Sequence, residues 1–137
     1  MKNYTVFTLA LMLCSQLLFA QKKPYNIVFD ITSKDTIDHK NVIRWVKEEL
    51  EAFPDANIEV VFYSKSLEMI TAKSIVAESV KELAKNPHVA FRACEVAMKN
   101  NNVDKSQLLP GVGTVPDGLH EIVNKQQEGW GYIKVSH

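Results

Sequence analysis

Cys94 is the side chain of this sequence best suited to nucleophilic chemistry. It stands in "VAFRACEVAMK" (residues 89–99), where an apolar, strand-like run passes directly into a helical pattern. The unpaired N–H groups and the dipole of a helix N-terminus favour an anion, and the thiolate is the reactive form of cysteine. Arg92 lies two residues earlier on the same strand face and adds positive charge, whereas Glu95 opposes it. The pattern therefore predicts a thiol that attacks a substrate atom and passes a group on.

A structural interpretation of Cys94 stays open beside the chemical one. Free cysteine is among the most buried residue types and often serves only as a small hydrophobic side chain. The helix that follows is short, so its spacing does not show whether Cys94 faces a crevice or the core.

The remaining candidates for chemistry form no comparable pattern. The four histidines are scattered without the spacing of metal ligands, so no metal site is predicted. His39 and His120 each fall in the first turn of a predicted helix, and we expect both to be solvated surface residues. Gly111 and Gly113 lack the setting of a dinucleotide site, and no phosphate-binding loop ending in Lys-Ser/Thr occurs, so no organic cofactor is predicted.

The elements that must position Cys94 follow a regular order. Five runs rich in β-branched and aromatic residues cover residues 25–31, 58–63, 89–93, 111–115 and 130–135, and each gap between them has a helical pattern. Strands that alternate with helices imply parallel crossovers, and the inner strands are apolar on both faces. The prediction is one three-layer α/β/α domain with a five-stranded, mainly parallel sheet. The last run is more mixed and is predicted to be an edge strand.

Capping residues and apolar stripes give the predicted helices their limits. Residues 38–53 have one apolar face and end before Pro54. Ser74 is predicted to cap the helix of the second gap, and Asp117 the last helix. The apolar positions of that last helix are Leu119, Ile122 and Val123.

Ligands of open parallel sheets bind outside the carboxyl ends of the strands, where the connections diverge. Cys94 lies at that edge, and the loops after the first and fourth predicted strands reach the same edge. The residues predicted to shape a binding crevice there are Arg92, Thr32, Ser33, Asp117 and Gly118. Asp30 ends the first strand, and its carboxylate is expected to cap the turn at residues 32–33.

The first 20 residues have the parts of a secretory signal peptide: a basic start, a short apolar stretch and a small residue at the break. We expect cleavage near Ala20, export to the periplasm or the medium, no stable membrane span afterwards, and a mature domain of residues 21–137. A retained membrane anchor or a lipid-modified Cys14 are the alternatives. Removal of Cys14 leaves Cys94 as the sole thiol, which excludes a disulfide within the subunit.

The charge balance excludes nucleic acid as the expected partner. The chain has 16 Lys and Arg against 16 Asp and Glu, and no basic stripe. Binding to nucleic acid depends mainly on neutralised phosphates, which this composition does not supply.

The sequence resembles the DsrE/DsrF-like family over nearly the whole mature chain. The residues that carry the resemblance are "YNIVFDITSKD", "FPDANIEVVFYS", "ACEVAMKNNNV" (93–103), "LLPGVGTVPDGLHEIV" (108–123) and "QEGWGYIKV" (127–135). The resemblance implies a five-stranded parallel sheet between helices and assembly into homo-oligomers such as trimers or hexamers. It also implies a cysteine that carries sulfur as a persulfide between a donor and an acceptor protein, and that cysteine falls on Cys94.

Three functional hypotheses follow. The first is an exported DsrE-like protein with sulfurtransferase-like sulfur carriage or other thiol transfer through Cys94, requiring no metal or cofactor. The second is a non-catalytic, oligomeric module for a small ligand or a partner, in which Cys94 only lines a pocket. The third is redox sensing through a disulfide between subunits.

Overall fold

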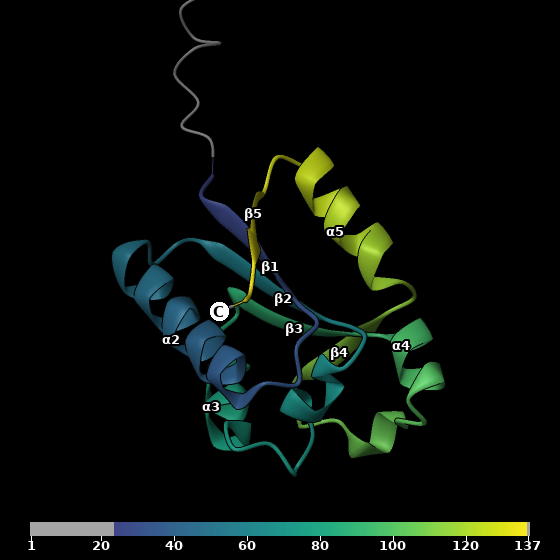
Figure 1. Ribbon diagram of the computed structural model, residues 1–137. Helices are drawn as coiled ribbons and strands as arrows, with labels where there is room; N and C mark the ends of the chain where they lie inside the picture. Colours follow the sequence, from purple (N-terminus) through teal and green to yellow (C-terminus); the bar gives the residue numbers. More distant parts are fainter. Residues whose placement is uncertain (1–23, 137) are drawn as a thin grey trace, which may run out of the picture.

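The computed structural model describes residues 24–136. The predicted signal peptide, its cleavage near Ala20, Cys14 and His137 lie outside the described residues. Within residues 24–136, five strands form one sheet: β1 (Asn26–Ile31), β2 (Asn57–Phe62), β3 (Val89–Cys94), β4 (Val112–Val115) and β5 (Gly131–Lys134). Each lies within a residue or so of its predicted position (Figure 1).

The sheet has the order β4-β3-β2-β1-β5, and all four neighbouring pairs are parallel. The prediction of an α/β domain with a five-stranded parallel sheet is confirmed, and the last strand is an edge strand as predicted. The register sets Lys134, Asp30, Val61, Arg92 and Gly113 side by side across the sheet. Because side chains alternate along each strand, these five positions belong to one face of the sheet.

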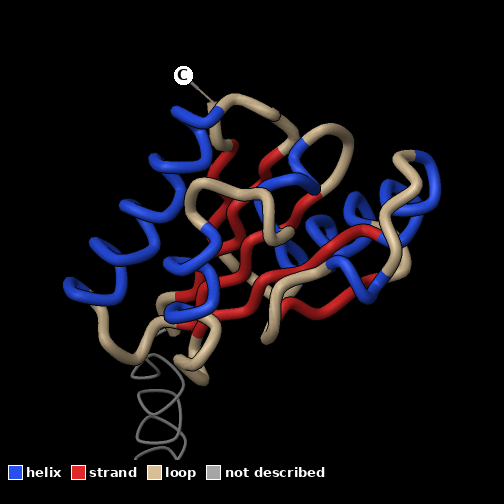
Figure 2. The backbone as a smooth tube through the Cα atoms, turned by 90° about the horizontal axis from the view of Figure 1, so that it is seen from below, coloured by secondary structure: helices blue, strands red, loops and turns tan. Residues whose placement is uncertain are grey.

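Helices cover both faces of the sheet (Figure 2). The helices and short 3-10 turns are α2 (Thr36–Ala52), η1 (Ser66–Ile70), α3 (Ala77–Leu83), α4 (Glu95–Asn100), η2 (Lys105–Gln107) and α5 (Gly118–Gln127). The buried residues of α2, α3 and α4 share one apolar cluster with Phe29, Val60 and Phe91 of the sheet. On the opposite face, Ile122 of α5 packs with Val28 and Val61.

Asp117 is the N-cap of α5, as predicted, and its carboxylate accepts hydrogen bonds from Leu119 N at 2.8 Å and His120 N at 3.2 Å. The prediction for Ser74 is wrong in position, because α3 has Val76 as its N-cap. Ser74 Oγ instead accepts a hydrogen bond from the backbone N–H of Val76 at 3.2 Å, so it satisfies the donor just before α3 begins.

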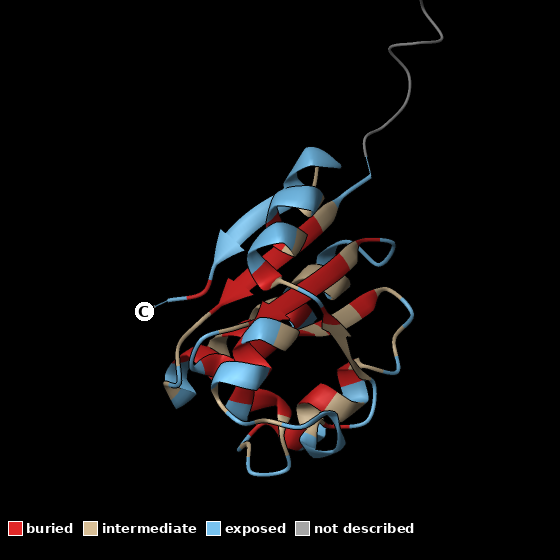
Figure 3. Ribbon diagram, turned by 90° about the vertical axis from the view of Figure 1, so that its right-hand side faces the viewer, coloured by how far each residue is buried: buried red, intermediate tan, exposed pale blue. Residues whose placement is uncertain are grey.

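The apolar pattern of α5 was a misleading guide to its buried face. Ile122 is buried, but Leu119 and Val123 remain 57% and 50% exposed. Gly118 and Ile122, four residues apart, face the sheet, and the neighbouring positions turn to solvent. Figure 3 shows this exposed side of α5 beside the equally exposed strand β5.

A buried carboxylate lies between the sheet and α5. Glu59 of β2 is 4% exposed, and its Oε2 lies 3.6 Å from Lys125 Nζ of α5. Among the described residues Glu59 Oε1 has no hydrogen-bond partner. The pKa of Glu59 is raised from 4.5 to about 7: burial is the largest cause, Lys125 and Arg92 oppose the shift, and Glu121 adds to it.

This shift predicts that the domain loses stability as the pH rises. Between about pH 4.5 and pH 7 the folded state holds a proton on Glu59 that the unfolded chain has released, so the free energy of unfolding falls across that window. Glu59→Gln mimics the protonated form and should remove this pH dependence. At pH 8 its free energy of unfolding should exceed that of the native chain by about 2 kcal/mol. Urea unfolding at pH 5 and pH 8 measures both effects. Glu51→Gln, at an exposed site on α2, is the matched control; an equal effect of both substitutions would contradict the assignment.

Candidate functional site

Cys94 is the last residue of β3 and the N-cap of α4, beside Val115 of β4. Its side chain is buried, with 5% of the residue exposed, and makes no capping hydrogen bond. The structure therefore places the thiol at the carboxyl edge of the sheet but beneath a cover. Within residues 24–136, no group of three or more His, Cys, Asp or Glu could hold a metal ion.

The sheet changes the direction of its connections at Cys94. Strand β3 leads into α4, whose Ala97 and Met98 join the apolar cluster of α2 and α3. The neighbouring strand β4 leads into α5, which packs on the opposite face. Such a switch point is where open parallel sheets bind their ligands, because diverging connections leave a crevice at the strand ends.

Gly118, the first residue of α5, closes over the thiol. A Cβ atom on Gly118 would lie 3.2 Å from Cys94 Cβ, 3.6 Å from Cys94 Sγ and 3.1 Å from Val61 Cγ1. These distances leave little room for any side chain larger than that of glycine. The first turn of α5 is thus seated directly on Cys94, so the sulfur lies next to two helix N-termini.

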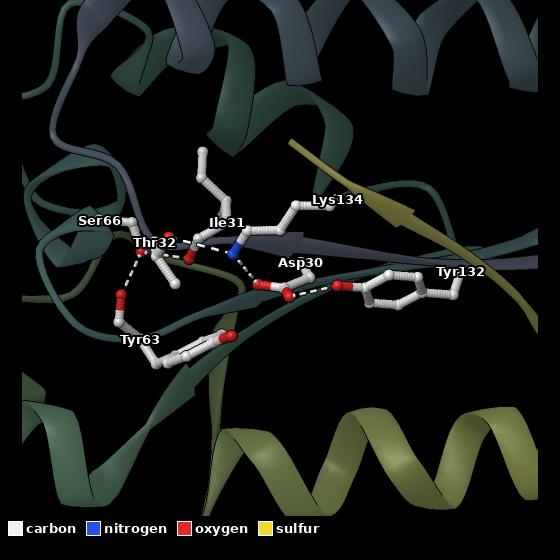
Figure 4. Close-up of polar contacts among 7 residues, drawn as sticks. All are labelled: Asp30, Ile31, Thr32, Tyr63, Ser66, Tyr132 and Lys134. Carbon is white, nitrogen blue, oxygen red and sulfur yellow. Dashed lines mark hydrogen bonds and ion pairs between the residues drawn. The ribbon is translucent and has the colours of Figure 1, made fainter. Parts of the chain in front are cut away.

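A group of polar side chains occupies the same face of the sheet toward β5 (Figure 4). We call Asp30, Thr32, Tyr63, Tyr132 and Lys134 the Asp30 cluster. The Asp30 carboxylate, 4% exposed as a residue, accepts hydrogen bonds from Tyr132 Oη at 2.7 Å and Lys134 Nζ at 2.9 Å. Lys134 also donates to Thr32 Oγ1 at 3.1 Å. The expectation that Asp30 caps the turn at residues 32–33 is therefore wrong, because its carboxylate faces strand β5.

Tyr63 is the member of the Asp30 cluster that interacts electrostatically with both the Asp30 carboxylate and the Cys94 thiol. It directly follows β2, and Lys134 Nζ lies 5.5 Å from its ring centroid. Burial is the largest cause that raises the pKa of Tyr63, followed by the Asp30 carboxylate, and Tyr132 and Cys94 raise it further. Burial and Asp30 also raise the pKa of Tyr132 to about 12. Both phenols remain protonated at neutral pH, and Tyr132 donates its O–H to Asp30.

The five predicted binding residues do not all gather at the thiol. Gly118 contacts it, and Asp117 is engaged in capping α5. Thr32 belongs to the Asp30 cluster. Ser33 stays in its own loop, where Ser33 Oγ accepts from Asp35 N at 3.0 Å.

Arg92 and the two N-terminal-turn histidines also have defined places. The Arg92 guanidinium lies against Gly113 of β4, on the face that also carries Cys94. His39 is buried, contrary to expectation, because its Nε2 lies 3.0 Å from the carbonyl oxygen of Ser33. His120 is exposed, as expected.

Tyr63, Tyr132 and Lys134 were not singled out from the sequence. The signal available was the alternation of Tyr132 and Lys134 in the last strand, which sends both side chains to one face. Their partner could be named only once β5 was known to pair with β1.

Loss of Lys134 should weaken the attachment of β5. Lys134→Met removes one hydrogen-bond donor from the buried Asp30 carboxylate and leaves the bond from the Tyr132 hydroxyl, so the free energy of unfolding should fall by about 1–3 kcal/mol. Asp30→Asn in the same chain should recover part of that loss. Urea denaturation of both single variants and the double variant measures the coupling, with Lys40→Met on α2 as control. Strictly additive losses would show that the pair contributes no interaction energy.

Comparison with solved structures places this fold among known ones. MTH1491 of Methanobacterium thermoautotrophicum has a TM-score of 0.76 and 33% identity, with 80% of this chain and 98% of that chain covered. The ychN protein of E. coli has a TM-score of 0.67 and 12% identity, covering 82% of this chain and 99% of its own, and it supports the fold alone.

Curated relatives give a weaker match. The Ras-related protein RABA4a of Arabidopsis thaliana is 31% identical over 100 residues, which are 73% of this chain and 40% of that protein. The chain thus spans about two fifths of the length of the curated relatives it matches. Gly113 and Gly118 have the spacing of a phosphate-binding P-loop, but Leu119 and His120 follow in place of its Lys-Ser/Thr pair.

The family profile covers almost all of the described chain. The profile described as "DsrE/DsrF-like family" matches residues 26–135, from the first residue of β1 to the residue after β5. This range includes Cys94, Gly118 and the whole Asp30 cluster. Together with the shared fold of MTH1491 and ychN, the match shows that the chain belongs to the DsrE/DsrF-like family.

Proposed function

We propose that this protein carries sulfane sulfur on Cys94, receiving it from a donor and releasing it to an acceptor. The observation that carries the proposal is the place of the thiol in a member of this family: the end of β3, at the switch point, under the first turn of α5. Such a position sets an anionic sulfur beside the starts of two helices, whose dipoles favour negative charge.

The transfer is a thiol exchange with balanced electrons. The Cys94 thiolate attacks the outer sulfur of a donor persulfide; a new S–S bond forms at Cys94, and the donor's own S–S bond breaks. The electron pair and the negative charge leave with the donor thiolate, so no oxidant or reductant is consumed. An acceptor thiolate reverses the step by attacking the outer sulfur held on Cys94.

Tyr63 is suited to assist this exchange from the protein side. Its raised pKa keeps the phenol protonated, and Cys94 contributes to that shift, so the two groups interact electrostatically. A protonated phenol near a sulfur anion stabilises it. The Asp30 carboxylate fixes the position of Lys134, and the Lys134 ammonium group lies over the Tyr63 ring. Tyr63 is the residue we assign to stabilising the leaving or arriving persulfide anion.

Access to the sulfur requires movement of the loop before α5. At 5% exposure Cys94 cannot meet a second protein's thiol, and Gly118 at the start of α5 lies directly against it. On the sheet side α5 is anchored by Ile122 and by the ion pair of Lys125 with Glu59, both further along the helix. The first turn can therefore lift while the rest of α5 stays packed.

Export and self-assembly complete the proposal. We propose that residues 1–20 direct export to the periplasm or the medium and that the mature chain forms a homo-oligomer. Exposed Leu119 and Val123 on α5 and Val96 on α4 supply apolar surface for contact between subunits. No helix within residues 24–136 has the length and apolar character to cross a bilayer.

The burial of Cys94 favours a second candidate function. In a non-catalytic binding or interaction module, the thiol would be a packing residue under Gly118 and would never meet a reagent. The two functions differ in whether Cys94 can be modified in the folded state.

Protein isolated from its native host should carry a fraction of Cys94 with one added sulfur atom. Mass spectrometry of the intact chain and of the peptide containing Cys94 detects it, and a mild reductant should remove it. Cys94→Ser should lack the added sulfur, whereas Tyr63→Phe should retain it at lower occupancy. A native protein that never carries sulfur, together with an unaltered phenotype for Cys94→Ser, would defeat the proposal.

The cover over the thiol predicts a specific rate pattern. Ellman's reagent should modify native Cys94 slowly. Gly118→Ala should speed the reaction by about tenfold, because the added methyl group crowds Cys94 and Val61 and destabilises the closed position of the first turn of α5 by about 1.4 kcal/mol. Leu119→Ala, at the adjacent exposed position, is the control and should leave the rate unchanged. Modification is located by mass spectrometry of the Cys94 peptide. A thiol that stays unreactive in every folded variant would favour the binding module.

A further inference from the structure

A cavity of about 860 Å³ lies at the carboxyl edge of the sheet, apart from the thiol. Its walls come from the loops after β1 and β2, from η1 and residues 71–73, from Lys81 of α3 and from residues 101–110. Cys94 does not line it. This volume falls within the range of about 300–1,000 Å³ that holds small organic ligands in proteins. Nothing in the sulfur chemistry of Cys94 uses this space.

The charged side chains that line the cavity are mostly positive. Lys34, Lys65, Lys73 and Lys81 line it, against the single carboxylate of Glu68 among the described lining residues. Lys81 is paired with Glu78 at 2.7 Å. The other three lysines have no ion pair within residues 24–136, and all three are exposed. A near-neutral chain thus gathers three lysines against one carboxylate around this cavity.

The floor of the cavity is apolar. Leu67 and Leu109 line it at 2% and 4% exposure, and partly buried Val103 and Leu108 lie beside them. A ligand that fills the cavity must therefore pair anionic groups with a non-polar body, since an inorganic ion would satisfy the lysines and leave the floor uncovered.

Two hydrogen bonds to backbone carbonyl groups hold the walls of the cavity together. Asn101 Nδ2 donates to the Ser64 carbonyl at 3.1 Å, and Leu109 N donates to the Ile70 carbonyl at 2.9 Å. Ser64 and Asn102, both in the lining, have positive φ values of 59° and 53°. These links join the loop after β2 to α4 and η1 to the following segment, so the cavity is formed before any ligand arrives.

We propose that this cavity is a binding site for a small organic anion with at least two negative charges and a non-polar body, such as a phosphorylated aromatic or aliphatic compound. Lysine ammonium groups bind phosphate as point charges, which suits a ring of flexible, exposed side chains. The partly buried Val103 and Leu108 contact the body of the ligand, and the lysines at the rim contact its charged groups. The site acts independently of sulfur transfer, so loss of Cys94 does not affect it.

Pyridoxal 5′-phosphate is a suitable probe, because it joins a phosphate to an aromatic body and forms a reducible imine with lysine. The full-length chain is treated with less than one equivalent, reduced with borohydride and mapped by peptide mass spectrometry. The label should concentrate on Lys34, Lys65 and Lys73, and excess inorganic pyrophosphate should suppress it. Lys40 and Lys47, exposed on α2 and outside the cavity, are internal controls that should stay at background.

Two double variants give the equilibrium test. Lys65→Ala with Lys73→Ala should weaken reversible binding of pyridoxal 5′-phosphate by about tenfold, the effect of losing two partly exposed charge pairs. Lys40→Ala with Lys47→Ala removes the same charge elsewhere and should leave the dissociation constant unchanged. Calorimetry measures both, and circular dichroism checks the fold. A label spread evenly over the exposed lysines, equal weakening in both variants, or no binding at all would overturn the proposal.

Discussion

The seating of Gly118 on Cys94 is the contact on which the functional arrangement depends. It brings the start of α5 against the end of β3 at a separation that a larger side chain would obstruct. The same contact buries the thiol, places it beside a second helix N-terminus and requires α5 to lie on the face opposite α2 and α3. A reactive thiol and its protection from solvent are thus one feature of the topology, because the connection that creates the switch point also supplies the cover.

The Asp30 cluster gives the exposed edge of the sheet its own support. Strand β5 is short and exposed along its length, so it contributes little apolar burial. Tyr132 and Lys134 compensate by converging on the buried carboxylate of Asp30, over a hundred residues earlier in the chain. Lys134 of the Asp30 cluster also lies over the ring of Tyr63, and Tyr63 interacts electrostatically with Cys94. The edge strand therefore supports the site at the switch point in addition to completing the sheet.

The sequence predicted the fold well because strand and helix patterns are local. Apolar runs, Pro54 and the Asp117 cap were enough to place five strands and the main helices, and the family resemblance agreed. The site was predicted less completely because its contacts join distant segments. Cys94 and Gly118 were both singled out, but the sequence could not reveal that one lies on the other. Asp30 and His39 were misjudged, since each finds a partner that only the folded chain supplies. Leu119 and Val123 show that apolar character alone does not fix which side of a helix is buried.

The central claim is that Cys94 accepts and passes on sulfur, and direct transfer tests it most simply. A small persulfide donor with a radiolabelled outer sulfur is mixed with the folded protein, and the protein is then separated and offered a second thiol. The account predicts label on Cys94 after the first step, its passage to the acceptor thiol in the second, and none of either with Cys94→Ser. Label that never reaches Cys94 in the folded native chain, while the unfolded chain accepts it readily, would contradict the account and leave the thiol as a packing residue.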